Sequence, residues 1–196
     1  MLLTKRQREI LLVAKKSFVE KGYTETSVRD IAENLGIQAA SLYNHFRSKE
    51  DILQAICEDI RLRFNDLKTD LRRAELSPEM KFFEFVKGYL TEMMKDTKAF
   101  ELYLQYWNVN ENFRSMYEED RQDFLMLVKE IFDNMGVKSD PHVYVADAPV
   151  LMVLTSLNLT PRLLADKENP DVEAVVNDFL SRLTQGFHGE KKQFNQ

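Results

Sequence analysis

Apolar residues recur at spacings of three and four along most of the chain, which is the period of an amphipathic helix. No segment shows the sustained apolar and polar alternation of a half-buried strand, and glycine occurs only six times in 196 residues. The pattern therefore predicts an all-α protein. The first helix is expected over residues 4–20, and Gly22 should end it in a left-handed conformation. Its inner face is predicted to contain Ile10, Val13, Ala14 and Phe18.

Two short helices and one long helix should follow. Thr26 or Ser27 is expected to cap a helix that continues to Leu35, and Gly36 ends it. A third helix is predicted over residues 38–47, and Ser48 is suited to cap a fourth helix over about 50–72. The fourth helix carries an apolar stripe of Ile52, Ile56, Ile60, Phe64, Leu67 and Leu71.

Later helix starts are marked by a capping residue followed by proline, which suits the first helical position because its missing N–H would be unpaired there. This pair occurs at Ser77-Pro78, Asp140-Pro141 and Asn169-Pro170. Five further helices are expected, over residues 78–95, 98–107, 111–135, 141–166 and 170–187, which makes about nine in all. Pro149 and Pro161 should kink the fourth of these five or restart it after Thr160.

Residues 28–46 fit two short helices joined by a tight turn, which is a helix-turn-helix pattern. Ala32 is small where the second helix must cross closely, and Gly36 supplies the turn. The inner faces are predicted to bury Ile31, Leu35, Ile37, Leu42 and Phe46. We expect a three-helix domain over residues 1–50 and a larger helical domain over residues 51–196, connected through the fourth helix.

The third predicted helix has an unusually polar outer side. When Leu42 and Phe46 point inward, the outer side carries Ala40, Ser41, Tyr43 and Asn44, with His45 at its edge. Such side chains can reach phosphates and base edges in a major groove. On an arbitrary helix the same residues would more often be a partly buried surface patch. The surrounding helix-turn-helix pattern favours DNA binding here.

Charge is distributed unevenly along the chain. The net charge is −5, yet residues 1–73 carry 14 basic and 11 acidic side chains, whereas the remaining 123 residues carry 13 basic and 21 acidic ones. This asymmetry indicates separate tasks for the two parts, although three net positive charges are also compatible with a solvated face.

The sequence indicates a cytoplasmic protein without a membrane span. Cys57 is the single cysteine and so forms no internal disulfide, and the first residues lack the pattern of a secretory signal. The most apolar run covers 17 residues, 143–159, and is interrupted by Asp147 and Pro149. A span needs about 20 predominantly apolar residues.

Motifs for metal binding and catalysis are absent from the sequence. The three histidines are far apart and show no metal-ligand spacing, and neither a glycine-rich phosphate loop nor a G-x-S-x-G motif occurs. We therefore expect no cofactor, no metal and no catalytic residue.

The stretch GYTETSVRDIAENLGIQAASLYNHFRSKEDIL, together with the preceding helix, resembles the N-terminal part of the TetR family of bacterial transcriptional regulators. The resemblance extends to about Ile56. The matching residues are Gly22-Tyr23, Thr26-Ser27, Ile31-Ala32, Gly36-Ile37, Leu42-Tyr43, His45-Phe46, Lys49-Glu50 and Leu53.

The resemblance implies a role in DNA binding for several residues. Tyr43, His45 and Lys49 would contact phosphates, and Arg29, Thr26 and Ser27 would add contacts to the DNA backbone. Base reading would come from Gln38, Ala39, Ala40, Ser41 and Asn44. Family members often have glycine or lysine where this chain has Ala39 and Ala40, and alanine offers only a methyl contact to thymine.

After Arg73 the resemblance is one of architecture. It implies a helical domain that binds a small effector and pairs with a second subunit through the last two long helices. Aromatic residues and methionines between Phe82 and Phe132 would suit an apolar or aromatic effector, although core packing remains the alternative for each. The candidate pocket residues are Tyr89, Met93, Tyr103, Trp107 and Phe124.

Together these features predict a homodimeric, ligand-responsive regulator that binds a double-stranded DNA operator and is released by a small-molecule effector. The resemblance favours repression over activation. Two alternatives remain: a helical ligand- or protein-binding module that keeps the helix-turn-helix pattern without operator binding, and an enzyme that modifies a small molecule. The missing catalytic motifs argue against the enzyme.

Overall fold

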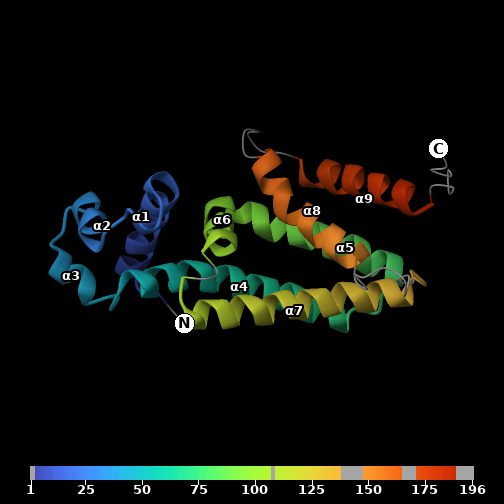
Figure 1. Ribbon diagram of the computed structural model, residues 1–196, viewed down its shortest axis with the longest axis horizontal. Helices are drawn as coiled ribbons and strands as arrows, with labels where there is room; N and C mark the ends of the chain where they lie inside the picture. The colour runs from blue at the N-terminus through green and yellow to red at the C-terminus, as the bar shows by residue number, and fades with distance from the viewer. Residues whose placement is uncertain (1–2, 107–108, 138–147, 165–170, 189–196) are drawn as a thin grey trace, which may run out of the picture. The chain divides into compact units, whose positions relative to one another are not determined.

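The computed structural model describes residues 3–106, 109–137, 148–164 and 171–188, which form nine helices and no strand. The predicted all-α class is therefore confirmed. The helices are α1 (Lys5–Lys21), α2 (Val28–Asn34), α3 (Ala39–Tyr43), α4 (Lys49–Arg73), α5 (Pro78–Lys95), α6 (Thr97–Gln105), α7 (Glu111–Asn134), α8 (Ala148–Leu164) and α9 (Val172–His188) (Figure 1). None of the helices in these ranges has the length and hydropathy that a bilayer crossing requires.

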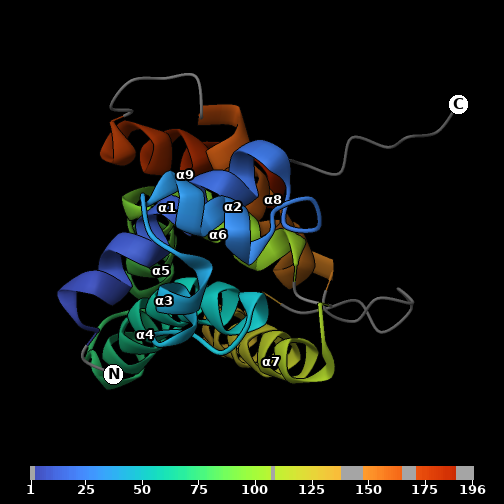
Figure 2. The ribbon, with the colours of Figure 1, turned by 90° about the vertical axis from the view of Figure 1, so that its left-hand side faces the viewer.

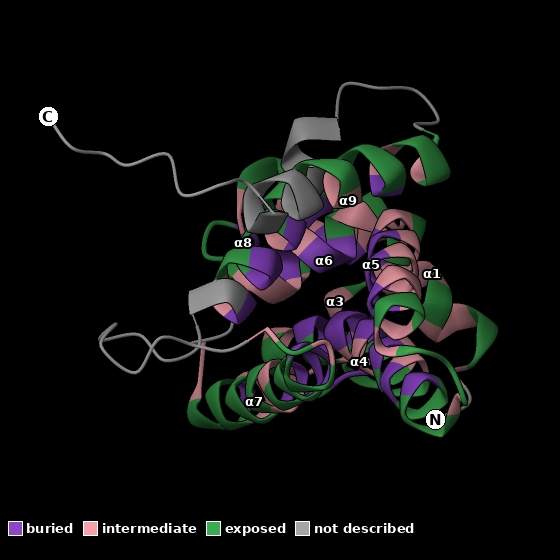
Figure 3. Ribbon diagram, turned by 90° about the vertical axis from the view of Figure 1, so that its right-hand side faces the viewer, coloured by how far each residue is buried: buried purple, intermediate pink, exposed green. Residues whose placement is uncertain are grey.

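The chain packs as two compact units. One comprises residues 1–66 and 95–123, which include α1, α2, α3 and α6, and the other comprises residues 67–94 and 124–196. Helices α4 and α7 each contribute to both units. Buried positions follow one side of α4 and of α5, as the purple segments in Figure 3 show. The predicted functional boundary after residue 50 stays a prediction.

The ends of the first two helices follow their capping residues. Thr4 forms a capping box with Gln7 at the start of α1, and Ser27 forms one with Asp30 at the start of α2. Ser27, not Thr26, is thus the cap. Gly22 ends α1 with φ 91° and ψ 149°, so φ is positive as expected but the residue lies outside the left-handed helical region.

The third helix is shorter than predicted. It was expected over residues 38–47, but α3 covers only Ala39–Tyr43. Its last turn tightens because the backbone N–H groups of His45 and Phe46 both donate to the carbonyl of Leu42, at 2.9 and 3.1 Å. The chain must then turn within five residues to start α4. There the Ser48 hydroxyl accepts a hydrogen bond from the N–H of Asp51 at 3.0 Å.

The later helices agree closely with the expected ranges where the structure describes them. Helix α5 covers residues 78–95 as predicted, and α6 begins at Thr97 because the Asp96 carboxylate accepts the N–H of Ala99. Helix α8 continues through Pro161, so the predicted restart after Thr160 is wrong. The proposed helix starts at Asp140-Pro141 and Asn169-Pro170 lie outside the described residues.

A buried ionic network joins three helices in the first unit. Asp120 of α7 is only 8% exposed, and its carboxylate accepts hydrogen bonds from Arg61 of α4 at 2.6 and 3.3 Å. The hydroxyl of Tyr103 in α6 donates to the same carboxylate at 2.7 Å. Figure 1 shows α4 and α7 running side by side here. The network therefore fixes how α4, α6 and α7 pack.

The core of the second unit depends on close packing of α5. Gly88 faces Leu67 so closely that an added Cβ would lie 2.4 Å from the Leu67 Cδ1 atom. Aromatic rings fill the remaining space: Phe82 contacts Phe132 at 5.1 Å between ring centroids, and Tyr89 contacts Phe124 at 5.4 Å. Glycine at position 88 thus allows the end of α4 to approach α5.

We expect Asp120→Asn to lower the free energy of unfolding by about 3 kcal/mol, because it removes the buried carboxylate that pairs with Arg61 and leaves the guanidinium only the more exposed carboxylate of Glu58. Urea denaturation followed by circular dichroism measures the change. The matched control is Asp178→Asn in the exposed Arg182–Asp178 pair of α9, which should leave the unfolding midpoint unchanged. Equal midpoints for both variants would contradict the structural role of Asp120.

Candidate nucleic-acid interface

The outer side of α3 and its flanking residues is accessible to solvent while its underside is buried. Tyr43 is 53% exposed, whereas Leu42 and Phe46 are 0% and 6% exposed. The other exposed residues of this surface are Gln38, Ala40, Ser41 and Asn44, and Ala39 and His45 are half-buried. Helices α2 and α3 lie at the front of the view in Figure 2. The polar outer side predicted from the sequence is therefore present, and we call this surface, Gln38–Ser41 with Tyr43, Asn44 and His45, the polar ridge.

The turn before α3 orients this surface. The N–H of Ile37 donates to the carbonyl of Ala32 at 3.0 Å, and Gly36 between them has φ 64°. Ala32 is 1% exposed, so its methyl group lies fully inside the packed pair of helices. A larger residue there would push α3 away from α2. The short α3 is thus held by tertiary packing, since five residues are too few for an independent helix.

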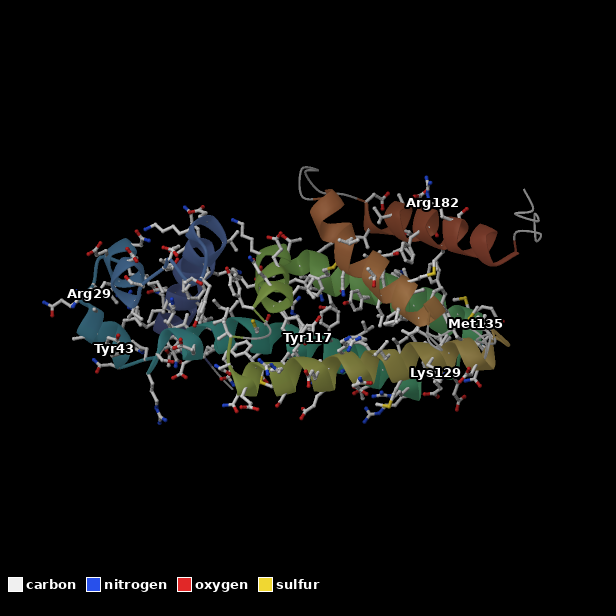
Figure 4. All side chains as sticks on the ribbon, viewed as in Figure 1. Arg29, Tyr43, Tyr117, Lys129, Met135 and Arg182 are labelled. Atoms are coloured by element: carbon white, nitrogen blue, oxygen red, sulfur yellow. The ribbon has the colours of Figure 1, made fainter. Side chains whose placement is uncertain are left out.

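A shallow hollow of about 350 Å³ lies beside the ridge. Its lining comes from the segment 24–29 together with Tyr43 and Lys49. Arg29 is exposed and extends outward from α2, and Tyr43 lies nearby at the end of α3 (Figure 4). The guanidinium of Arg29 and the phenol hydroxyl of Tyr43 offer two kinds of donor to a phosphate oxygen in this hollow.

Thr26 does not belong to the accessible surface. Its side chain is 1% exposed, and its hydroxyl donates to the carbonyl oxygens of Gly22 at 2.8 Å and Ser17 at 3.2 Å. Both hydrogen bonds of this hydroxyl lie within the chain, and the contact with the DNA backbone that the resemblance implied for Thr26 stays a prediction. Thr26 ties the α1–α2 turn, residues 22–27, to the end of α1.

Lys49 is held by the same turn. Its ammonium donates to the carbonyls of Tyr23 at 2.7 Å, Thr26 at 2.9 Å and Thr24 at 3.3 Å. It also lies 4.3 Å from the centre of the Tyr23 ring. All three of its N–H donors have acceptors in this arrangement. A phosphate contact by Lys49 stays a prediction, and it requires at least one of these hydrogen bonds to be exchanged.

Tyr23 is the buried centre of the turn. It is 6% exposed, and its hydroxyl donates to the Glu50 carboxylate at 3.0 Å. Burial and the acceptor Glu50 raise the pKa of Tyr23. A hydrogen bond from its own backbone N–H, with a further one from Tyr23, lowers the pKa of Glu50. Both groups therefore keep their ordinary charge at neutral pH.

The candidate effector residues are divided between the two units. Tyr89, Met93 and Phe124 are buried in the second unit, whereas Tyr103 belongs to the first, where its hydroxyl donates to Asp120. Trp107 lies outside the described residues. A role in effector binding for any of the five stays a prediction.

Polar groups accompany the aromatic residues of the second unit. The Tyr89 hydroxyl donates to Asn158 at 2.6 Å, and the ammonium of the buried Lys68 lies 4.7 Å from the centre of the Phe124 ring. Neither Lys68 nor Asn158 was a candidate from the sequence. The burial of Lys68 could not be predicted from the sequence, because a lysine beside the apolar stripe of an amphipathic helix is expected to be exposed to solvent.

Comparisons with known proteins agree with this architecture. Residues 10–56 match the family described as bacterial regulatory proteins, tetR family. The chain is 43% identical over 54 residues to the HTH-type transcriptional repressor KstR2 of Mycolicibacterium smegmatis, a match that covers 28% of this chain and 26% of that protein. In this match, the chain thus spans about a quarter of the length of KstR2.

Solved structures extend the likeness to most of the chain. The TetR family transcriptional regulator PfmR of Thermus thermophilus has a TM-score of 0.75 at 25% identity, covering 89% of this chain and 96% of that one. AibR, solved in complex with isovaleryl coenzyme A and operator DNA, has a TM-score of 0.74 at 16% identity, covering 91% and 97%. At this sequence identity, the similarity to AibR shows only that the two proteins share a fold.

Helix α3 has a buried underside and a polar outer side, and the other described elements are also helices. These features define an all-α helix-turn-helix protein. Within that class, residues 10–56 have the sequence of the TetR family of bacterial regulatory proteins. The chain as a whole has the fold of a solved TetR-family regulator.

We expect Thr26→Val to lower the free energy of unfolding by about 1–2 kcal/mol, because it removes the buried hydroxyl that donates to the carbonyls of Gly22 and Ser17. Thr24→Val is the matched control, since Thr24 is exposed two residues away and should change stability by less than about 0.5 kcal/mol. Thermal and urea unfolding measure both. A Thr26→Val variant as stable as Thr24→Val would disprove the structural role.

Proposed function

We propose that this protein is a transcriptional repressor that binds a pseudo-palindromic DNA operator as a homodimer and is released by a small apolar or aromatic effector. The observation that carries the proposal is the accessible polar ridge of α3 above the buried Leu42 and Phe46. The match of residues 10–56 to the TetR family supports it. Such a regulator acts in the cytoplasm, where a bacterium keeps its DNA.

The ridge enters a major groove and reads base edges in this proposal. Gln38 and Asn44 are its amide side chains, and both are exposed. Amides can bind adenine through two hydrogen bonds, Ser41 can bind several bases, and the methyl groups of Ala39 and Ala40 suit thymine. Base preference thus rests on two amides, a hydroxyl and two methyl groups.

Phosphate contacts hold the ridge in its groove. Tyr43 and His45 belong to the ridge, Arg29 on α2 lines the hollow described above, and so does the exposed Ser27, the N-cap of α2. Lys49 joins them when a phosphate replaces one of its carbonyl acceptors. These contacts set position and contribute equally to all sequences.

Exposed apolar residues on α8 support the homodimer. Met152 is 65% exposed and Leu159 is 50% exposed, and their spacing of seven places them on one side of the helix. The opposite side is already used within the subunit, since Val150, Val153 and Leu157 are at most 3% exposed. A second subunit that covers Met152 and Leu159 would remove this apolar surface from water.

The effector is assigned to the second unit, residues 67–94 and 124–196, as part of the larger domain expected over residues 51–196. The buried side chains of Tyr89, Met93 and Phe124 supply apolar surface, and Lys68 and Asn158 add two polar groups beside them. Mostly apolar walls with few polar groups are typical of small-molecule sites. An effector that prefers one arrangement of these helices would shift the protein away from the DNA-bound state.

A gel shift with the DNA upstream of the protein's own gene tests operator binding. We expect wild-type protein to shift one fragment specifically, with Arg29→Ala weakening binding and reducing the slope of log K against log salt by about one, because one phosphate contact is lost. Arg182→Ala on α9 is the control and should leave both quantities unchanged. A folded protein that shifts no fragment would favour the alternative, a helical binding module that keeps the helix-turn-helix pattern.

Sedimentation equilibrium tests the dimer. Wild-type protein should sediment with twice the subunit mass of 23.0 kDa. Met152→Asp should shift it towards the subunit mass, because the carboxylate would be desolvated in the interface. Met126→Asp is the control, since Met126 is a similarly exposed methionine, at 59%, on α7. A Met152→Asp variant that remains fully dimeric would exclude this side of α8 from the interface.

A further inference from the structure

The last turn of α6 makes direct contact with the α1–α2 turn, and this contact has no place in the proposed DNA interface. Tyr106 follows α6 as its C-cap residue, and its own N–H donates to the carbonyl of Leu102. Its hydroxyl accepts a hydrogen bond from the backbone N–H of Tyr23 at 3.1 Å. The two rings also pack, with centroids 5.2 Å apart. Figure 1 shows α6 beside α1.

Tyr23 in turn contacts the first two residues of α4. Its carbonyl and ring hold the ammonium of Lys49, and its hydroxyl donates to the Glu50 carboxylate. The same Lys49 ammonium reaches the carbonyl of Thr26, the residue before the α2 cap. A continuous series of contacts therefore runs from Tyr106 through Tyr23 to the starts of α4 and α2.

The Tyr106 hydroxyl satisfies a backbone donor that the local chain leaves without an acceptor. Gly22, with φ 91° and ψ 149°, turns the chain away from α1, so the next N–H does not continue the helical hydrogen bonds. Tyr23 is 6% exposed, which limits access of water to this N–H. A buried N–H without an acceptor is costly, so its loss would favour another conformation of the turn.

We propose that Tyr106 is a positioning residue for DNA binding. Its hydroxyl fixes the α1–α2 turn, and the turn sets Lys49 and the start of α2 in the arrangement that meets the DNA backbone. Tyr106 itself touches no DNA. The inference rests on the proposed function and adds to it a residue at the end of α6 that determines operator affinity.

A second link between α1 and α6 provides a matched control. The ammonium of Lys15 pairs with the carboxylate of Asp96, the N-cap of α6, at the other end of that helix. Lys15→Met breaks this pair and keeps most of the apolar stem, but it leaves the α1–α2 turn untouched. If α6 acted only by supporting α1, Lys15→Met and Tyr106→Phe would have similar effects on DNA binding.

The first test measures operator affinity of the full chain by fluorescence anisotropy, with a labelled duplex that the wild-type protein binds. Tyr106→Phe keeps the ring and removes the hydroxyl, so we expect the Kd to rise about tenfold, the effect of one unsatisfied buried donor. The salt slope should stay unchanged because no phosphate contact is removed. Lys15→Met should change the Kd less than about twofold.

A double variant separates positioning from general loss of structure. In a Lys49→Met background the turn no longer holds the start of α4 through the ammonium, although the hydrogen bond from Tyr23 to Glu50 remains. Adding Tyr106→Phe should therefore raise the Kd by a smaller factor than it does in the wild-type protein. Two outcomes overturn the proposal: a Tyr106→Phe variant that binds DNA as wild type does, or full additivity of the two substitutions after correction for the folded fraction.

The second test does not need DNA and keeps the inference distinct from the proposed function. Hydrogen exchange measured by mass spectrometry should show faster deuterium uptake in residues 22–30 and 47–53 of Tyr106→Phe, and not of Lys15→Met. Unchanged uptake in Tyr106→Phe would overturn the positioning role, even if the wild-type protein binds an operator. Faster uptake, in a protein that binds no DNA, would keep the positioning of the turn and reject the proposed function alone.

Discussion

The convergence of three backbone carbonyls on the Lys49 ammonium is the interaction on which the helix-turn-helix part of the first unit depends. The α1–α2 turn contributes these carbonyls, from Tyr23, Thr24 and Thr26. Carbonyls after a helix end require donors, and a charged ammonium at the start of α4 supplies them. A single side chain thereby joins the end of α1, the approach to α2 and the beginning of α4.

The apolar core and the polar contacts of this unit have different tasks. Ile10, Ile31 and Leu42 are fully buried and supply the free energy that holds the helices together. Hydrogen bonds from Thr26, Tyr23 and the network around Asp120 choose one arrangement among those that such a core would allow. A buried polar group stabilises only the arrangement in which its partners are present.

Much of the fold could be predicted from the sequence because its signals are local. Capping residues such as Ser27 and the three-and-four periodicity located helices within a few residues, as for α5. The length of α3 could not be predicted, because tertiary geometry, not propensity, ends it after Tyr43.

The exposed side of α3 could be predicted from the positions of Leu42 and Phe46 in the sequence. The burial of Thr26 could not be predicted. A threonine at a helix start has the same sequence signature whether its hydroxyl faces solvent or a preceding carbonyl. The link from Tyr23 to Tyr106 joins residues 83 positions apart, and no local pattern reports such a contact. Long-range polar contacts therefore mark the limit of what the sequence alone provides.

In the proposed function, the five-residue α3 has a consequence for how operator recognition can diversify. Its fold depends on one buried anchor, Leu42, and on the following Phe46, while Ala40, Ser41 and Asn44 make no contribution to the core. Those exposed positions can therefore exchange side chains with little cost to stability. A gene duplicate could acquire a new set of target genes through a few such exchanges while retaining its scaffold.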